Sequence, residues 1–297
     1  MGAPDETPAR YLTSLLAAPM APRERVATTH DERGTPLAMN PYIGITGFMS
    51  PEEIRQFPRQ YAALPGHALM LGVLVSQKTM DGEPPGNPRR YPPLREIGEI
   101  LLGARHFFPH PPLSLVHFNS RTFDLVGQIA RLLLRLGSVC NGVQLNVVWP
   151  QPDVIAELRD TAPRHEIVMQ IGPVALENVE YDPEAVARRV AEWYEGKIDA
   201  VLVDLSGGRG LPFDLERGAP IVRALRRACP TLPIGVAGGL CAETLPALAP
   251  LLDEFPDLSL DAEGRLRDDQ DNLDLVKSVA YLDEAARLVT GHRRPKP

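Results

Sequence analysis

The sequence lacks any long run of apolar residues. No stretch of the 297 residues approaches the roughly 18 consecutive apolar positions that a membrane-spanning helix requires. Charged residues also interrupt every apolar stretch near the N-terminus, so we expect no secretory signal peptide. These residues are Asp5, Glu6, Arg10, Arg23 and Arg25. The pattern therefore predicts a chain with no membrane partner.

Cysteine is also scarce. The chain holds three cysteines, Cys140, Cys229 and Cys241, and no C-x-x-C motif. An odd, small number without paired spacing excludes a disulfide scaffold and a thiolate zinc site, and it fits a reducing compartment. We expect a cytoplasmic protein that needs no cofactor.

An excess of positive charge is absent as well. The net charge is −7 at pH 7, so nothing electrostatic favours nucleic acid or an anionic membrane. Hydrophobic residues make up 44% and charged residues 23%, which is ordinary for a globular protein. We therefore expect a small-molecule substrate as the partner, together with a homodimer as the possible assembly.

The chain does contain apolar strand-like segments that alternate with amphipathic helical segments. The predicted strands are 40–48, 67–77, 112–119, 142–148, 166–171, 199–205, 232–237 and 258–261. The predicted helices are 50–64, 94–102, 120–136, 151–159, 182–194, 215–228, 242–252 and 272–289. Strict alternation of this kind predicts a parallel sheet.

Eight such units in about 250 residues are typical of an α/β fold of the (β/α)8 type, the TIM barrel. An open doubly wound sheet is the alternative, although no G-x-G-x-x-G follows the first strand. We predict one barrel domain over 39–290, with an N-terminal extension over 1–38 that contains a short helix at 11–16. Residues 291–297 are predicted to form a disordered tail.

The stretch from Asp199 to Asp214, DAVLVDLSGGRGLPFD, organises the rest of the chain. A buried apolar strand leads to Asp204, and a glycine-rich turn with Ser206, Gly207, Gly208 and Gly210 follows. Barrel enzymes place their chemistry at such strand ends. Glycines allow backbone N–H groups to approach an anion closely, so the turn predicts an anion cradle. The alternative is that Asp204 caps a helix and the glycines only form a tight turn.

Polar residues also occur at the carboxyl ends of the other predicted strands. They are Thr46, Gln77, Lys78, His117, Asn119, Gln144, Asn146, Gln170, Gly238, Gly239, Asp261 and Glu263. Side chains two apart on a strand share a face, so His117 pairs with Asn119 and Gln144 with Asn146. The set predicts the floor of a polar pocket, or else a hydrogen-bonded layer without a reaction. The long polar loop 78–93 is functional or disordered.

Four motifs together resemble phosphoribosylanthranilate isomerase over about 41–290. The Asp199–Asp214 stretch is similar to that family's sixth-strand segment. Ile43-Gly44-Ile45-Thr46 before Ser50-Pro51-Glu52-Glu53 is similar to its first strand. Gly142–Asn146 resembles its fourth strand, V-Q-L-H, and Val236–Leu240 resembles its seventh-strand turn. The resemblance implies a barrel enzyme in which Asp204 is a general acid.

Three departures from that family argue against its own reaction. Ile43 stands where the resemblance places a cysteine general base, and Asn146 stands where it places a histidine. Asp261-Ala262-Glu263-Gly264 replaces small residues that hold a phosphate. These carboxylates would repel a phosphate unless Arg265 or Arg267 compensates. We therefore expect a divergent member without standard isomerase activity.

The function predicted from these residues is acid–base chemistry, by an isomerase or a lyase, on a small sugar or sugar phosphate. The predicted catalytic residues are Asp204, His117 and Lys78, with Asp261 or Glu263 as other candidates for the base. The predicted ligand-binding residues are Asn119, Gln144, Asn146, Gln170, Gly207, Gly208, Gly210, Gly238, Gly239, Asp261 and Glu263.

Two further hypotheses stay open at this point. A non-catalytic barrel could bind a small molecule through the glycine-rich anion cradle and return it unchanged. A metal-assisted enzyme could use Asp204, Asp261, Glu263 and His117 as oxygen and imidazole ligands, although no spacing forces them together.

Overall fold

The computed structural model is a closed barrel of eight parallel strands, each of which pairs with the next along the chain. The structure describes residues 39–64, 66–120, 124–207 and 209–291. β8 pairs with β1 and closes the ring, with Gly44 opposite Asp261. The strands are β1 Tyr42–Thr46, β2 Ala68–Ser76, β3 Leu113–Asn119, β4 Gly142–Asn146, β5 Glu166–Ile171, β6 Ala200–Asp204, β7 Ile234–Ala237 and β8 Ser259–Ala262.

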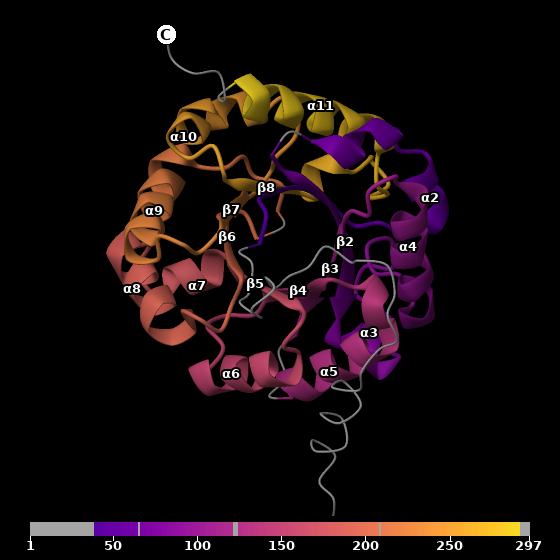
Figure 1. Cartoon of the computed structure of the whole chain (residues 1–297), viewed down its shortest axis with the longest axis horizontal. Helices are drawn as coiled ribbons and strands as arrows, with labels where there is room; N and C mark the ends of the chain where they lie inside the picture. Colours follow the sequence, from indigo (N-terminus) through magenta and orange to yellow (C-terminus); the bar gives the residue numbers. More distant parts are fainter. Residues whose placement is uncertain (1–38, 65, 121–123, 208, 292–297) are drawn as a thin grey trace, which may run out of the picture.

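The helices form an outer ring around the strands, as Figure 1 shows in a view along the barrel. They are α2 Pro51–Arg55, α3 Gln77–Asp81, α4 Leu94–Phe107, α5 Leu125–Leu136, α6 Pro152–Thr161, α7 Pro173–Glu177, α8 Pro183–Tyr194, α9 Leu215–Ala228, α10 Ala249–Glu254 and α11 Leu275–Gly291. Short 3-10 helices occupy Arg59–Ala63, Gly137–Val139, Leu245–Leu248 and Gly264–Leu266. Within the described ranges, no helix is both long and apolar enough to cross a membrane.

Two apolar cores hold the barrel together, one on each face of the sheet. The larger lies between the strands and the helices, where one side chain in two along each strand packs outward. The smaller fills the barrel interior toward the amino ends of the strands. It is built from Met39, Tyr42, Met70, Leu115, Val168, Ala200, Leu202 and Ala237. The interior is therefore packed below the site and rigidly supports it.

The predicted barrel is confirmed, and so are its eight strands in their predicted order. The predicted helix 50–64 is wrong in part, because α2 ends at Arg55 and a 3-10 helix begins at Arg59. Pro58 lies between them and has no N–H to continue the helix. The predicted helix 242–252 is likewise a 3-10 helix followed by α10.

Two short helices were not predicted. α3 begins at Gln77, the last residue of the predicted strand 67–77, and continues into the segment predicted as loop, because Ser76 and Thr79 form a capping box at its start. α7 follows β5 and has Pro173 at its first position. The predicted extension 1–38, its helix at 11–16 and residues 292–297 of the predicted tail lie outside the described residues. α11 itself extends through Gly291.

Candidate active site

A polar cleft of about 210 Å³ opens at the carboxyl ends of the strands. All eight strands run parallel, so their last residues meet at this end of the barrel. The lining residues are Thr46, Leu74, Arg90, Tyr91, His117, Asn119, Gln144, Asn146, Gln170, Leu202, Asp204, Ser206, Gly207, Gly210, Ala237, Gly238, Gly239, Asp261, Ala262, Glu263 and Gly264.

The cleft floor lies one layer above the apolar interior. Along β3, Leu115 belongs to the interior core, and His117, two residues later on the same face, lines the cleft. β5 makes the same change from Val168 to Gln170. These two strands thus contribute an apolar residue below and a polar residue above, which separates the packed core from the site.

Asp204 ends β6 and accepts four hydrogen bonds. Its Oδ1 accepts from Ser206 N at 2.9 Å, Ser206 Oγ at 3.0 Å and Gly207 N at 3.0 Å. Its Oδ2 accepts from Gln170 Nε2 at 2.8 Å. The turn therefore fixes the carboxylate plane and fully occupies Oδ1, while Oδ2 keeps one site for a further donor. The N–H of Gly207 already has a partner, so it is not directed at an external anion.

Asp261 lies on β8 in a different environment. It is buried, and its Oδ1 accepts one hydrogen bond from Thr46 Oγ1 at 3.2 Å. Burial, reinforced by the nearby negative charge of Glu263, raises the pKa of Asp261 to about 8. At pH 7 this carboxyl is protonated and can donate a proton.

His117 lies between Thr46 and Gln144 on the same floor. Thr46 Oγ1 lies 3.2 Å from its Nε2 and 3.4 Å from its Nδ1, and Gln144 Nε2 donates to its Nδ1 at 3.1 Å. Burial lowers the pKa of His117 to about 3, so the ring is neutral at pH 7. Space for this arrangement exists because residue 72 is glycine. A Cβ at Gly72 would lie 2.3 Å from Thr46 Oγ1 and 2.9 Å from His117 Nε2.

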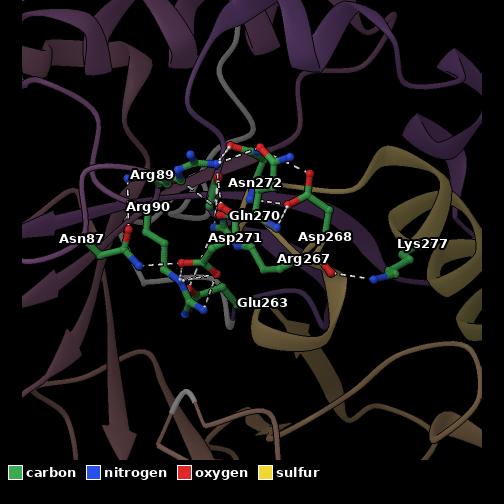
Figure 2. A network of polar contacts seen from close by, with 11 residues as sticks. Asn87, Arg89, Arg90, Glu263, Arg267, Asp268, Gln270, Asp271, Asn272 and Lys277 are labelled. Carbon is green, nitrogen blue, oxygen red and sulfur yellow. Dashed lines mark hydrogen bonds and ion pairs between the residues drawn. The ribbon is translucent and has the colours of Figure 1, made fainter.

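The rim of the cleft is an ionic network that joins the loop after α3 to the loop after β8 (Figure 2). Arg90 Nη1 donates to Glu263 Oε1 at 3.0 Å, and Arg90 Nε and Nη2 both donate to the Asp271 carboxylate. Asn87 Nδ2 also donates to Asp271 Oδ2 at 2.5 Å. The hydrogen bonds from Arg90 lower the pKa of Asp271 to about 2. The loop is thereby held against the barrel, and its residues Arg90 and Tyr91 reach the cleft.

The arginine nearest to the carboxylate of Glu263 is Arg90, which the sequence analysis did not name as a partner. Arg267 Nη2 lies farther away, 3.9 Å from Glu263 Oε1. Arg267 is buried and also donates to the carbonyl oxygen of Gly47. Arg265, the other candidate, donates instead to the carbonyl oxygen of Gly210. Only one of the two expected arginines therefore lies near Glu263.

Most of the predicted site residues do meet in this cleft. Those that line it are Asp204, His117, Asn119, Gln144, Asn146, Gln170, Gly207, Gly210, Gly238, Gly239, Asp261 and Glu263. Lys78 does not line it: the side chain is exposed on α3, a helix that the capping box starts directly after β2. The structure therefore does not bring Lys78 together with Asp204 and His117. Gly208 lies outside the described residues.

The residues that the prediction missed are Arg90, Tyr91 and Ser206. Ser206 could have been found, because it lies two residues after Asp204 in the stretch already singled out. The only sequence signal for Arg90 and Tyr91 is the unusual length of the loop that carries them.

Ile43 does not line the cleft. It packs outward in the core between strands and helices, whereas the neighbouring Gly44 faces the interior, where its Cβ would lie 3.1 Å from Asp261 Oδ1. Ile43 therefore takes no part in the cleft, and the comparison with a cysteine at this position stays a prediction. None of the three cysteines lines the cleft either.

The residues of the metal hypothesis do not form a metal site. Among the described residues, no group of three or more His, Cys, Asp or Glu side chains is placed to hold an ion. Asp204 and Asp261 direct their oxygens to hydrogen-bond donors of the protein instead.

The chain resembles several solved barrels at low sequence identity. Phosphoribosyl anthranilate isomerase from Thermus thermophilus is 16% identical, with 83% of this chain and 99% of that chain covered and a TM-score of 0.55. TrpF from Jonesia denitrificans is 16% identical, with 85% and 99% covered and a TM-score of 0.52. The catalytic domain of a chitinase from Pyrococcus furiosus is 11% identical, with 87% and 99% covered and a TM-score of 0.50.

No family model matches the sequence, and no curated protein matches it. Likeness at these identities shows the fold, a barrel of the phosphoribosylanthranilate isomerase type. The chitinase shares that fold, so the chemistry of this chain has to be argued from its own cleft.

Proposed function

We propose that this chain is a barrel enzyme that performs acid–base chemistry, as an isomerase or a lyase, on a small sugar or sugar phosphate. The observation that carries the proposal is the contrast between two carboxyl groups in one cleft. Asp261 is buried with a pKa of about 8, whereas Asp204 is held as an acceptor by four donors. Two carboxyl groups in unlike environments are the arrangement that acid–base enzymes use.

The roles follow from the hydrogen bonds. Asp261 is the general acid, because it carries a proton at pH 7 and faces the cleft. Asp204 is the general base, and it takes the substrate proton on Oδ2, the oxygen with one remaining site. His117 stays neutral and orients Thr46 rather than transferring a proton itself. This assignment reverses the role of general acid that the family resemblance implies for Asp204.

The substrate class follows from the size and chemistry of the cleft. A volume of about 210 Å³ is below the range of roughly 300–1,000 Å³ for drug-sized ligands, so it suits a small molecule. Amide side chains of Asn119, Asn146 and Gln170 line the walls. Each amide offers a donor and an acceptor, which matches the hydroxyl groups of a sugar.

Whether the sugar is phosphorylated depends on the balance of charge at the rim. The positive-φ turn at Gly238 and Gly239 and the guanidinium of Arg90 favour an anionic group. The carboxylates of Asp204 and Glu263 disfavour an anionic group, because like charges repel. The proposal therefore covers both a sugar and its phosphate, and the ligand panel below separates them.

The reaction that the titles of the similar structures name is not proposed for this chain. At 16% identity the likeness carries no residue roles, and the cleft holds no cysteine. The binding-only barrel is less well supported than the enzyme. Part of its anion cradle is already engaged, because the N–H groups of Ser206 and Gly207 donate to Asp204. The turn at Gly238 and Gly239 would then have to supply the rest.

The test has a binding step and a turnover step. Pentoses, hexoses and their phosphates are titrated by calorimetry, with ribose, ribose 5-phosphate and inorganic phosphate as a matched set. Compounds that bind are then followed by NMR for conversion. The proposal expects conversion of at least one compound by the wild type and none by Asp204→Asn. Binding with no conversion of any compound would favour the binding barrel instead.

A further inference from the structure

A chain of hydrogen bonds crosses the cleft floor from Asp204 to His117 through two amide side chains. Gln170 Nε2 donates to Asp204 Oδ2 at 2.8 Å, and Gln144 Nε2 donates to Gln170 Oε1 at 3.2 Å. Gln144 Nε2 also donates to His117 Nδ1 at 3.1 Å. Thr46 Oγ1 lies beside the imidazole, 3.2 Å from Nε2 and 3.4 Å from Nδ1, and it donates to Asp261 Oδ1 at 3.2 Å.

The hydrogen bond between Gln170 and Asp204 determines which atom donates in each of the following hydrogen bonds. Ser206 and Gly207 occupy Oδ1 of Asp204, so Oδ2 faces Gln170 and requires its NH2 group as a donor. The oxygen of Gln170 must then face Gln144, which has to present its own NH2 group.

The second half of the chain continues the same logic. The NH2 group of Gln144 also faces His117 Nδ1, so this nitrogen must be the acceptor and the ring proton must reside on Nε2. The chain thus has one consistent polarity from Asp204 to His117.

We propose that Gln170 and Gln144 are positioning residues that transmit the hydrogen-bonding state of residue 204 to His117. An acceptor at the Oδ2 position sets the His117 proton on Nε2. A donor at that position would turn both amides over and set the proton on Nδ1. The two amides thus form a relay that ends at the imidazole.

Burial supports this two-state behaviour, since His117, Gln144 and Thr46 are all nearly inaccessible to water and cannot exchange these partners for solvent. The neutral ring carries one proton, so only the two tautomers are available. The use of the relay in a reaction rests on the proposed function, because there it couples the general base Asp204 to the neutral imidazole on the cleft floor. The direction of the hydrogen bonds does not rest on that function.

The experiment reads the His117 tautomer by NMR of protein labelled with ¹⁵N at histidine. His117→Asn assigns the signal, because the chain has seven histidines. The wild type is expected to carry the proton on Nε2. In Asp204→Asn the three donors from Ser206 and Gly207 hold the amide oxygen at the Oδ1 position, so Nδ2 faces Gln170 as a donor. The proton is then expected on Nδ1.

Two controls make the result specific. Asp160→Asn changes an exposed carboxyl outside the cleft, and the tautomer should stay as in the wild type. Gln170→Leu interrupts the relay. In that background, the His117 tautomer should be the same with Asp204 and with Asp204→Asn. If Asp204→Asn does not fold, the wild-type tautomer is the main result, and Gln144→Glu then tests the last link alone, because a carboxylate beside Nδ1 requires a proton there.

A wild-type ring with its proton on Nδ1 would overturn the relay. So would an Nε2 proton that persists in folded Asp204→Asn, or in Gln144→Glu where that variant has been used. The readout needs no substrate, so its failure is distinguishable from a failure of the proposed function, which shows only in turnover.

Discussion

Thr46 Oγ1 donates a hydrogen bond to Asp261 Oδ1 across 3.2 Å, at the point where β1 and β8 close the barrel. This hydrogen bond from β1 lowers the pKa of the buried Asp261, but burial raises that pKa by more. Burial and the neighbouring Glu263 raise the pKa of Asp261 to about 8. A proton donor therefore stands at the floor of a cleft that also holds the acceptor Asp204.

The raised pKa of Asp261 should appear in the stability of the protein. The folded state keeps this proton up to about pH 8, whereas the unfolded chain loses it near pH 4. The stabilisation is therefore complete below about pH 4 and is lost as the pH rises to 8. Between pH 6.5 and 8 it lowers the free energy of unfolding by about 1.4 kcal/mol per pH unit. Urea unfolding of wild type and Asp261→Asn should differ by this slope.

His117 acts in the opposite sense below that window. Its pKa is lowered to about 3, so the unfolded chain binds a proton near pH 6.5 that the folded protein does not bind. Its contribution to stability is present above pH 6.5 and is lost as the pH falls toward 3. The two slopes therefore oppose each other between about pH 4 and 6.5. The free energy of unfolding of Asp261→Asn could instead fall with pH above 6.5 as steeply as that of the wild type. That result would show that Asp261 is charged at pH 7.

Activity on a substrate found by the ligand panel should need protonated Asp261. We expect kcat/KM to fall tenfold per pH unit above about pH 8, because the general acid is then ionised. Asp261→Asn should lose activity by roughly 10²–10⁴-fold, the usual contribution of a general acid. A pH profile from 5 to 9.5 checks both statements. A flat profile through pH 9 would assign the acid to another group.

Asp204→Asn should remove activity and leave the fold in place. The asparagine keeps an acceptor for Ser206 and Gly207 but has no basic oxygen for the substrate. We expect a loss of at least about 10²-fold in kcat, with circular dichroism and thermal unfolding close to the wild type. Turnover at the normal rate would remove Asp204 from the proposed chemistry.

Gly72→Ala should disturb the cleft floor from within the barrel. The added Cβ would lie 2.3 Å from Thr46 Oγ1, so Thr46 and His117 must move apart. We expect a destabilisation of about 1–3 kcal/mol from overpacking, together with a loss of activity. The matched control is Gly86→Ala, where the new Cβ meets nothing within 4 Å and the backbone needs no positive φ. Equal effects of the two substitutions would contradict the packing described for Gly72.

Arg90→Gln should release the loop that forms the rim. The substitution removes the contacts to both Asp271 and Glu263, so residues 82–93 should become more susceptible to proteolysis. The melting temperature should change little, because these side chains are 21–30% exposed and ion pairs of this kind contribute about 0–1 kcal/mol. Arg95→Gln, which breaks an exposed pair with Glu96, is the control. Unchanged cleavage of the loop would mean that Arg90 does not hold it.

The sequence was sufficient to predict the barrel and most of its cleft. Strand–helix alternation defines the fold, and the parity of side chains along a strand places His117 and Gln144 on the cleft floor. Arg90 could not be predicted, because its partner Asp271 is 181 positions away and only tertiary contacts bring them together. Lys78 was misplaced because a single capping box turned a predicted loop into a helix. The outward position of Ile43 could not be predicted from the motif match, because such a match does not fix which face of the strand a residue occupies.

Deuterium incorporation tests the central claim most directly. The protein is incubated in D2O with the panel of sugars and sugar phosphates, and exchange at carbon is followed by NMR and mass spectrometry. If Asp204 and Asp261 remove and return a carbon-bound proton, the wild type should incorporate deuterium into at least one compound. Asp204→Asn and Asp261→Asn should not label it. An absence of labelling for every compound that binds, or equal labelling by Asp204→Asn, would contradict the account.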